Sequence, residues 1–206
     1  MKACLSIGVL SLLLCASAFG QSPSLNSAMP AAARPGMTTT ITFFGQNLGG
    51  PTELWTSFPA GTACEADSTA SDTDKAAYRL TLLPDLPVGI GAVRLATTNG
   101  VSNLQLFMID DLPSGVDNGT NHTLQTAQEI APPVAVDGNC EELGFDFFQI
   151  SARRGQRICV EAVAQRIGSD LDPVLRLLDA QGRELAYCDD APGLGAPLQG
   201  YYQQLY

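Results

Sequence analysis

Acidic side chains gather at the expected turns of the C-terminal part of the chain. The candidates are Asp146, Asp170, Asp172, Asp189 and Asp190. Carboxylate oxygens clustered in loops are ligands that Ca²⁺ prefers, since this ion takes six to eight oxygen atoms. A calcium site forms here if the loops meet at one end of a sheet. The alternative is turn capping, because aspartates at strand ends commonly accept hydrogen bonds from nearby backbone N–H groups.

Residue types suited to catalysis are poorly combined in this chain. A Ser-His-Asp triad needs a histidine as general base, and the only one is His122, in a stretch expected to lack a scaffold. A nucleophilic cysteine lacks a base for the same reason. The pairs Asp170–Asp172 and Asp189–Asp190 resemble the paired carboxylates of glycosidases only in residue type. The sequence therefore predicts a protein that is not an enzyme.

Cysteine usage indicates disulfides. Of 6 cysteines, those remaining after removal of the N-terminal segment are Cys64, Cys140, Cys159 and Cys188. An even number in an exported chain favours disulfides, although four cysteines allow three connectivities. Side chains alternate between the two faces of a strand, so Cys159 points outward if Ile158 and Val160 face the core, and Cys188 points outward if Leu185 and Tyr187 do. Because the two strands are expected to be neighbours, we predict a disulfide between Cys159 and Cys188. The chain has no CxxC pair, which argues against zinc.

The N-terminal segment predicts export. Residues 1–20 contain Lys2, the apolar run Cys4–Cys15, and small residues that allow cleavage after Ala18 or Gly20, which is typical of a secretory signal peptide. A lipid anchor on Cys15 is a minor alternative, because a lipoprotein signal has a small residue directly before the modified cysteine and Leu14 stands there instead. We expect a secreted or cell-surface protein with no transmembrane span. A net charge of −10 argues against nucleic acid as a partner.

Short strands separated by turns are expected to position these residues, so the fold class predicted is all-β. The chain combines 45% hydrophobic residues with 20 Gly and 13 Pro, as many short strands require. The first domain, residues 21–112, opens on a flexible lead-in over 21–33. Its strands are expected around Thr39–Phe43 and over 53–58, 78–83, 91–97 and 104–109, with a loop over 59–75 and a hairpin at Asn99-Gly100.

The start of this domain carries a family pattern. Pro30, Arg34-Pro35-Gly36, Thr40-Ile41-Thr42-Phe43 and Gly45-Gln46-Asn47-Leu48 stand in order. They resemble the opening of immunoglobulin-like IPT/TIG domains. The resemblance implies a small sandwich that serves as a spacer or an interaction module.

A linker over 113–120 is expected to lead into a second domain over 121–206. Asn118-Gly-Thr and Asn121-His-Thr match the N-glycosylation pattern, with a plain polar linker as the alternative. Strands are expected over 145–150, 157–164, 174–178 and 184–188, and the acidic pair Asp189-Asp190 follows the last of them.

These strands also carry a family pattern. Asp146-Phe147-Phe148, Gly155-Gln156-Arg157-Ile158, Asp172-Pro173-Val174-Leu175, Gly182-Arg183-Glu184-Leu185 and Asp189-Asp190 follow one another. They resemble the bacterial pre-peptidase C-terminal (PPC) domain, a jelly-roll β-sandwich, and the two-part order is similar to exported proteins of planctomycete-type bacteria. Residues 197–206 depart from the family pattern. We therefore expect a sandwich whose closing strands are missing.

The resemblance implies a non-catalytic exported accessory module that assists secretion, localisation or surface attachment. One alternative is an adhesion module that binds a polysaccharide or extracellular-matrix polymer through exposed aromatics such as Trp55, Tyr201 or Tyr202, each of which can instead be a core or edge residue. Another is a non-catalytic fragment of a larger secreted peptidase precursor. No cofactor other than calcium is expected.

Overall fold

The protein is an all-β structure, as the sequence predicts. The computed structural model describes residues 21–50, 52–64, 73–189 and 204–205. These residues form strands and two single-turn 3₁₀ helices, η1 (Leu124–Thr126) and η2 (Gln165–Ile167). Over those ranges, no helix has the length and apolar character that a membrane crossing requires. The predicted signal peptide lies outside the described residues.

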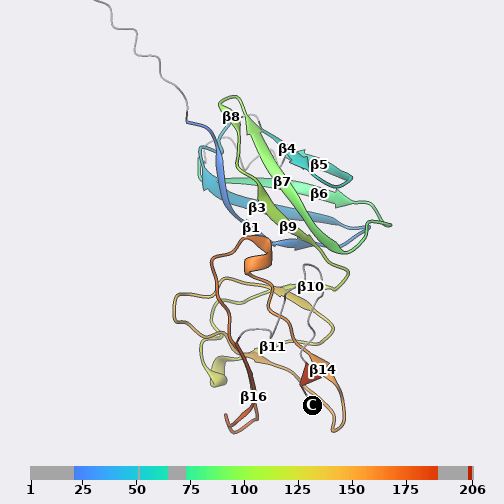
Figure 1. Cartoon of the computed structure of the whole chain (residues 1–206), viewed down its shortest axis with the longest axis vertical. Helices are drawn as coiled ribbons and strands as arrows, with labels where there is room; N and C mark the ends of the chain where they lie inside the picture. The colour runs from blue at the N-terminus through green and yellow to red at the C-terminus, as the bar shows by residue number, and fades with distance from the viewer. Residues whose placement is uncertain (1–20, 51, 65–72, 190–203, 206) are drawn as a thin grey trace, which may run out of the picture.

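The N-terminal part is a sandwich of two sheets (Figure 1). One sheet has the order β1 (Ser24–Met29), β3 (Thr38–Gln46), β6 (Lys75–Leu82), β5 (Ala60–Cys64). The other has the order β2 (Ala32–Ala33), β9 (Gln105–Ile109), β7 (Gly89–Thr97), β4 (Thr52–Thr56), and β8 (Gly100–Val101) pairs with β7. This is the strand order of constant-type immunoglobulin sandwiches, with the first strand divided between both sheets.

Alternating apolar side chains from both sheets fill the core between them. The fully buried members include Ile41, Phe43, Tyr78, Leu80, Leu82, Val93, Leu95 and Phe107. Phe43 meets Tyr78 edge-on at 6.1 Å between ring centroids. Phe58 stacks on Phe107, also at 6.1 Å. These strands have the period of two that places every second side chain on the inner face.

Two segments of this sandwich differ from the expectation. The lead-in over 21–33 contains β1 and β2, and its Leu25 and Ala33 are buried in the core. The loop expected over 59–75 contains β5, which pairs with β6. Both segments are rich in Ala, Ser, Gly and Thr. Small residues give little periodic signal, so pairing with a neighbouring strand decided their structure.

The hairpin expected at Asn99-Gly100 is confirmed, with Thr97 opposite Gly100.

The C-terminal part consists of short two-stranded ladders. β10 (Ser114–Val116) lies parallel to β12 (Ala135–Asp137), and β11 (Gln128–Glu129) lies parallel to β13 (Phe148–Gln149). β14 (Ile158–Cys159) is antiparallel to β17 (Gln204–Leu205), and β15 (Leu175–Leu178) is antiparallel to β16 (Glu184–Cys188).

Two expectations for this part are corrected. The segment 113–120, expected to be a linker, contributes β10 to a ladder because its backbone pairs with β12. The strand expected over 157–164 is paired only at Ile158–Cys159 and runs into η2. The strands expected at 174–178 and 184–188 are confirmed as β15 and β16.

The C-terminal part exposes apolar side chains that a closed sandwich would cover. Among its described residues only Asn121 and Ala164 are buried. Exposed large apolar residues include Phe145, Phe148, Leu185 and Tyr187. Ladders of this size do not by themselves exclude water from both faces.

The two parts meet where β2 and β9 approach η2 and β12. The Ala31 N–H donates a hydrogen bond to Asp137 Oδ1 at 2.9 Å. The other carboxylate oxygen, Oδ2, is buried without a hydrogen-bond partner. Burial raises the pKa of Asp137, with the nearby Asp110 carboxylate adding to the effect. Figure 1 shows η2, in orange, directly below β1 and β9.

Candidate functional site

The strongest candidate for a binding surface is the outer face of the sheet β2–β9–β7–β4. Trp55 lies on the edge strand β4, where Leu54 points into the core and Trp55 points out. Its side chain is 54% exposed, although it is the only tryptophan of the chain. Trp55 is therefore not a core residue but an exposed residue of an edge strand, which is the other alternative that the sequence allowed. Tyr201 and Tyr202 lie outside the described residues.

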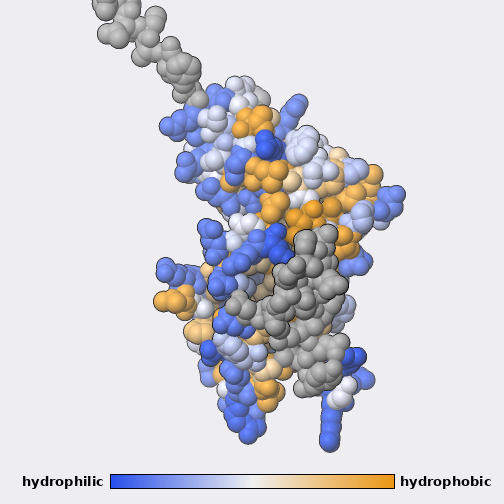
Figure 2. All heavy atoms as spheres, in the orientation of Figure 1, coloured by the Kyte–Doolittle hydropathy of each residue, from blue (hydrophilic) through white to orange (hydrophobic). Residues whose placement is uncertain are grey.

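Neighbouring side chains extend this face. Arg94 of β7 stands directly opposite Trp55 in the antiparallel register and is also exposed. Side chains that face each other across an antiparallel pair are about 4.5–5.5 Å apart at Cβ and interact directly. Ile90, Val101 and Leu104 are exposed apolar residues of the same sheet and its loops. Figure 2 shows apolar atoms gathered over β7 and β9 on the side turned to the viewer.

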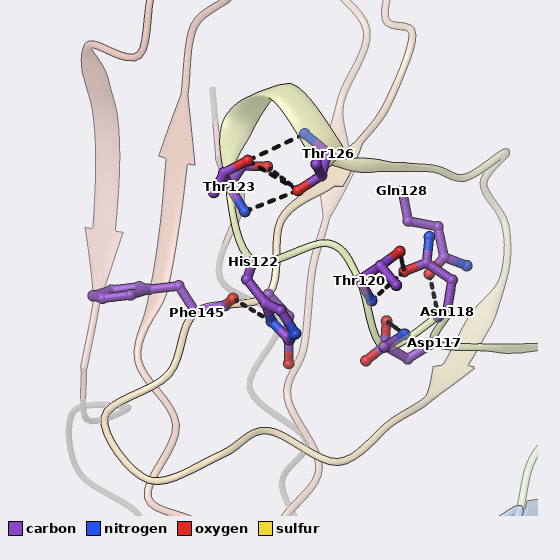
Figure 3. Close-up of polar contacts among 10 residues, drawn as sticks. Asp117, Asn118, Thr120, His122, Thr123, Thr126, Gln128 and Phe145 are labelled. Atoms are coloured by element: carbon purple, nitrogen blue, oxygen red, sulfur yellow. Dashed lines mark hydrogen bonds and ion pairs between the residues drawn. The ribbon is translucent and has the colours of Figure 1, made fainter.

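Polar contacts hold the segment around His122, which the sequence placed in a stretch without a scaffold. His122 Nδ1 lies 3.1 Å from Asp146 Oδ1 and 3.4 Å from the Phe145 carbonyl oxygen. The Phe145 carbonyl and the Asp146 carboxylate raise the pKa of His122. Figure 3 shows His122 beside Phe145. The expectation of an unsupported histidine is therefore corrected, because Asp146 approaches from 24 residues further along the chain.

A thiol lies near this pair without forming a nucleophile. Partial burial and the Asp146 carboxylate raise the pKa of Cys140, which keeps the thiol protonated near neutral pH. Asp146 Oδ1 contacts the imidazole, and the same carboxylate contributes to the raised pKa of the thiol. A catalytic cysteine instead needs a lowered pKa and a base within hydrogen-bonding reach. The cluster is best described as a structural contact between the 118–122 and 144–147 segments.

The two glycosylation motifs differ in access. Asn118 is exposed, and its Oδ1 accepts hydrogen bonds from Thr120 N–H at 2.9 Å and Thr120 Oγ1 at 3.0 Å (Figure 3). Asn121 is 0% exposed, and neither of its side-chain polar atoms has a hydrogen-bond partner. Asn121 is therefore closed to modification in the folded protein.

The acidic residues of the predicted calcium site have separate partners. Asp146 contacts His122, Asp172 Oδ1 accepts a hydrogen bond from Gln165 at 3.4 Å, and Asp189 Oδ2 accepts one from the Tyr187 hydroxyl at 3.0 Å. Asp170 is exposed, and Asp190 lies outside the described residues. Within the described part of the chain, no three His, Cys, Asp or Glu side chains are grouped to hold a metal ion. Calcium binding therefore stays a prediction.

Asp179, which is not among the predicted calcium ligands, caps the turn between β15 and β16. Asp179 Oδ1 accepts hydrogen bonds from the backbone N–H groups of Gln181 and Arg183, both at 2.9 Å. Its Oδ2 accepts one from Arg183 Nε at 2.7 Å. These bonds, led by the Arg183 backbone N–H, lower the pKa of Asp179. The Asp-Ala-Gln-Gly spacing was the available signal, since Asp favours the first position of such turns.

The cysteines with described side chains are unpaired in this structure. Cys140, Cys159 and Cys188 are free thiols. The strands of the predicted bridge are not ladder partners, because β14 pairs with β17 and β16 pairs with β15. Among the described residues, Cys159 and Cys188 therefore lie on strands that are not hydrogen-bonded to each other. Their bridging stays a prediction that mass spectrometry of a non-reduced digest tests.

A shallow pocket beside the β15–β16 hairpin is too small for most ligands. It has a volume of about 50 Å³ and is lined by Val160, Leu175, Arg176, Leu177, Ala186, Tyr187 and Cys188. Pockets for small molecules typically measure about 300–1,000 Å³. A binding role therefore has better support on the open sheet face than here.

Comparisons with known proteins leave the family open. No protein-family model matches the chain, and no curated protein matches it. A solved structure of a gamma-CGTase from the alkalophilic bacterium Bacillus clarkii is 19% identical, covers 52% of this chain and 15% of its own chain, and has a TM-score of 0.33. That likeness is too weak to carry an argument. The TIG-like and PPC-like resemblances stay predictions.

Proposed function

We propose that this chain is an exported, non-catalytic attachment module that binds an extracellular polysaccharide through the outer face of the sheet β2–β9–β7–β4. The observation that carries the proposal is Trp55, a 54% exposed indole on an open sheet face. Contiguous exposed apolar patches commonly mark an interaction surface, and Ile90, Val101 and Leu104 are further exposed apolar residues of the same sheet and its loops. The predicted signal peptide and the PPC-like resemblance support export.

The chemistry of this face suits a sugar chain. An indole presents a flat apolar surface with one N–H donor, and the C–H face of a pyranose ring packs against such a surface. The Arg94 guanidinium, opposite Trp55, can donate several hydrogen bonds to hydroxyl or carboxylate oxygens. A polymer can lie along an open face of this kind without a deep pocket.

Binding to insoluble polysaccharides tests the proposal. The purified full chain is mixed with cellulose, chitin, starch or pectin, sedimented, and the unbound fraction is measured. Trp55→Ala should weaken binding about tenfold or more, as expected when a central aromatic contact is removed. Phe44→Ala is the matched control, because Phe44 is an aromatic residue, 41% exposed, on the opposite sheet. Circular dichroism verifies that both variants fold.

Three results would contradict the proposal. One is the absence of binding to every polysaccharide tested. Another is binding by Trp55→Ala that equals the wild-type protein, which would place the contact elsewhere. A loss in both variants would show that the second sheet also takes part and would contradict the assignment to this face.

A further inference from the structure

The dipeptide Asn118-Gly119 lies in an exposed turn shortly after β10. Two hydrogen bonds end on its amide oxygen, because Asn118 Oδ1 accepts from the Thr120 N–H at 2.9 Å and from Thr120 Oγ1 at 3.0 Å (Figure 3). These donors draw electron density from the side-chain carbonyl, which makes its carbon, Cγ, more electrophilic. Donors placed in this way also stabilise negative charge that develops on the oxygen during a nucleophilic attack.

A carboxylate lies at the peptide nitrogen that follows Asn118. The Gly119 N–H donates a long hydrogen bond to Asp117 Oδ1 at 3.4 Å. Asp117 is held in place, since its own N–H donates to the Asp137 carbonyl oxygen at 2.8 Å and a Cβ added to Gly138 would lie 2.9 Å from the Asp117 Cβ. A general base must reach the proton that it removes, and such contacts are often long before the reaction begins. Asp117 is therefore positioned to take the Gly119 proton.

We propose that Asn118 is a self-modifying site, at which the Gly119 nitrogen attacks Asn118 Cγ and converts this residue through a succinimide to an isoaspartyl or aspartyl residue. The N–Cγ bond forms while the Asp117 carboxylate accepts the Gly119 proton, and the two Thr120 donors bind the developing oxyanion. The Cγ–Nδ2 bond then breaks, and Asp117 returns the proton to the departing nitrogen, which leaves as ammonia. Water opens the five-membered ring at either carbonyl. Nothing is oxidised or reduced, and the reaction is independent of polysaccharide binding.

The glycine leaves the attacking nitrogen accessible. Gly119 has φ of +65°, and no atom of the described residues lies within 4 Å of the position that a Cβ would take. Glycine is the residue type that permits close approach of another group to the backbone. Asn118, Gly119 and Thr120 are all exposed, so water can also reach the succinimide.

The chain contains the same dipeptide a second time, as Asn99-Gly100. There Gly100 pairs with Thr97 between β7 and β8, and a Cβ added to Gly100 would lie 3.2 Å from Ser22 Oγ. In the described part of the chain, no donor binds the Asn99 amide oxygen and no carboxylate accepts the Gly100 N–H. Since the two dipeptides have the same intrinsic chemistry, a difference in their rates measures what the local structure contributes.

Peptide mass spectrometry of the full chain tests the proposal. The protein is incubated for several weeks at neutral pH and physiological temperature, and it is digested in water labelled with heavy oxygen, which marks any deamidation that occurs during preparation. Asn118 should be converted at least about tenfold faster than Asn99, with an isoaspartyl product identified by electron-transfer fragmentation. Hydroxylamine should cleave the chain after Asn118 while the succinimide is present. In urea that unfolds the protein, the two rates should converge.

Variants separate the contributing groups. Asp117→Asn should slow the reaction at Asn118 about tenfold, and Thr120→Val should slow it about fivefold, because each removes a group that touches a reacting atom. Neither should change the rate at Asn99. Thr120→Ser keeps the hydroxyl and should react as the wild type. Asp111→Asn, which removes another exposed carboxylate, is the matched control for Asp117→Asn and should also leave the rate unchanged.

Equal rates at Asn118 and Asn99 in the folded protein overturn the proposal, and so does an Asn118 that stays unmodified throughout the incubation. Reaction of both Asp117→Asn and Thr120→Val at the wild-type rate overturns the roles assigned to these side chains. Thermal melts report the fold of each variant. If Asp117→Asn does not fold, the pair Thr120→Val and Thr120→Ser keeps the experiment decisive, because the Thr120 side chain is exposed and its backbone N–H is retained in both.

Discussion

Replacing Phe43 by alanine should cost the N-terminal sandwich a large share of its stability. Phe43 is 0% exposed and meets Tyr78 edge-on at 6.1 Å. A buried phenylalanine hides about 150–250 Å² of surface, which at about 25 cal/mol per Å² corresponds to roughly 4–6 kcal/mol. Residual burial in the unfolded chain lowers this to about 3–5 kcal/mol, the range measured for Phe→Ala in cores.

The loss expected for Phe43→Ala is large compared with the total free energy of unfolding of the sandwich. A domain of about 90 residues is stable by roughly 5–13 kcal/mol. The neighbouring Phe44 supplies the comparison, because it lies on the same strand but is 41% exposed. Phe44→Ala should cost only about 1–2 kcal/mol, since water already reaches much of its ring.

Urea unfolding of the full chain measures both effects. Trp55, the only tryptophan, reports on this sandwich through its fluorescence. With a slope of about 1 kcal/mol per M, Phe43→Ala should lower the midpoint by about 3 M or leave the sandwich unfolded in buffer. A Phe43→Ala midpoint within about 1 M of the Phe44→Ala midpoint would refute this reasoning, because the core would not be where the structure places it.

Two further predictions follow from single contacts. Gly91→Ala should destabilise the sandwich by about 1–3 kcal/mol in the same urea assay, because the new Cβ would clash with the Phe58 ring. Gly89→Ala is the control and should change little, because the space at its Cβ is open. Equal losses of unfolding free energy in the two variants would contradict the packing of Gly91 against Phe58. His122→Gln should lower the melting temperature at pH 5.5 but not at pH 8. The Phe145 carbonyl and the Asp146 carboxylate raise the pKa of His122, so these contacts stabilise the fold at low pH, and that contribution is lost as pH rises through the raised pKa. A deficit independent of pH would argue against contacts made by the protonated imidazole.

The strands with large alternating side chains were predictable from the sequence. Phe43, Tyr78 and Leu95 lie on segments whose period of two fixes which face is buried, so β3, β6 and β7 were expected close to their observed bounds. The segments β1, β2 and β5 were missed. Their small residues are buried or paired only because neighbouring strands are adjacent in space.

The candidate sites show the same division. Trp55 was named from its residue type, but its exposure depends on β4 being an edge strand. The sequence suggested the acidic residues as ligands of one calcium site, whereas in the structure Asp146, Asp172 and Asp189 each contact a different residue. The contact of Asp146 with His122 joins residues 24 positions apart, so no local sequence pattern indicates it.

The sequence by itself determined the all-β class and the alternation that builds the first core. Each follows from the two-residue period of extended backbone, which is a local property. Only the tertiary structure decided which strands pair, that Trp55 faces outward, and that His122 meets Asp146. Those outcomes depend on the packing of two sheets and on which edges remain open, and both are properties of the assembled chain.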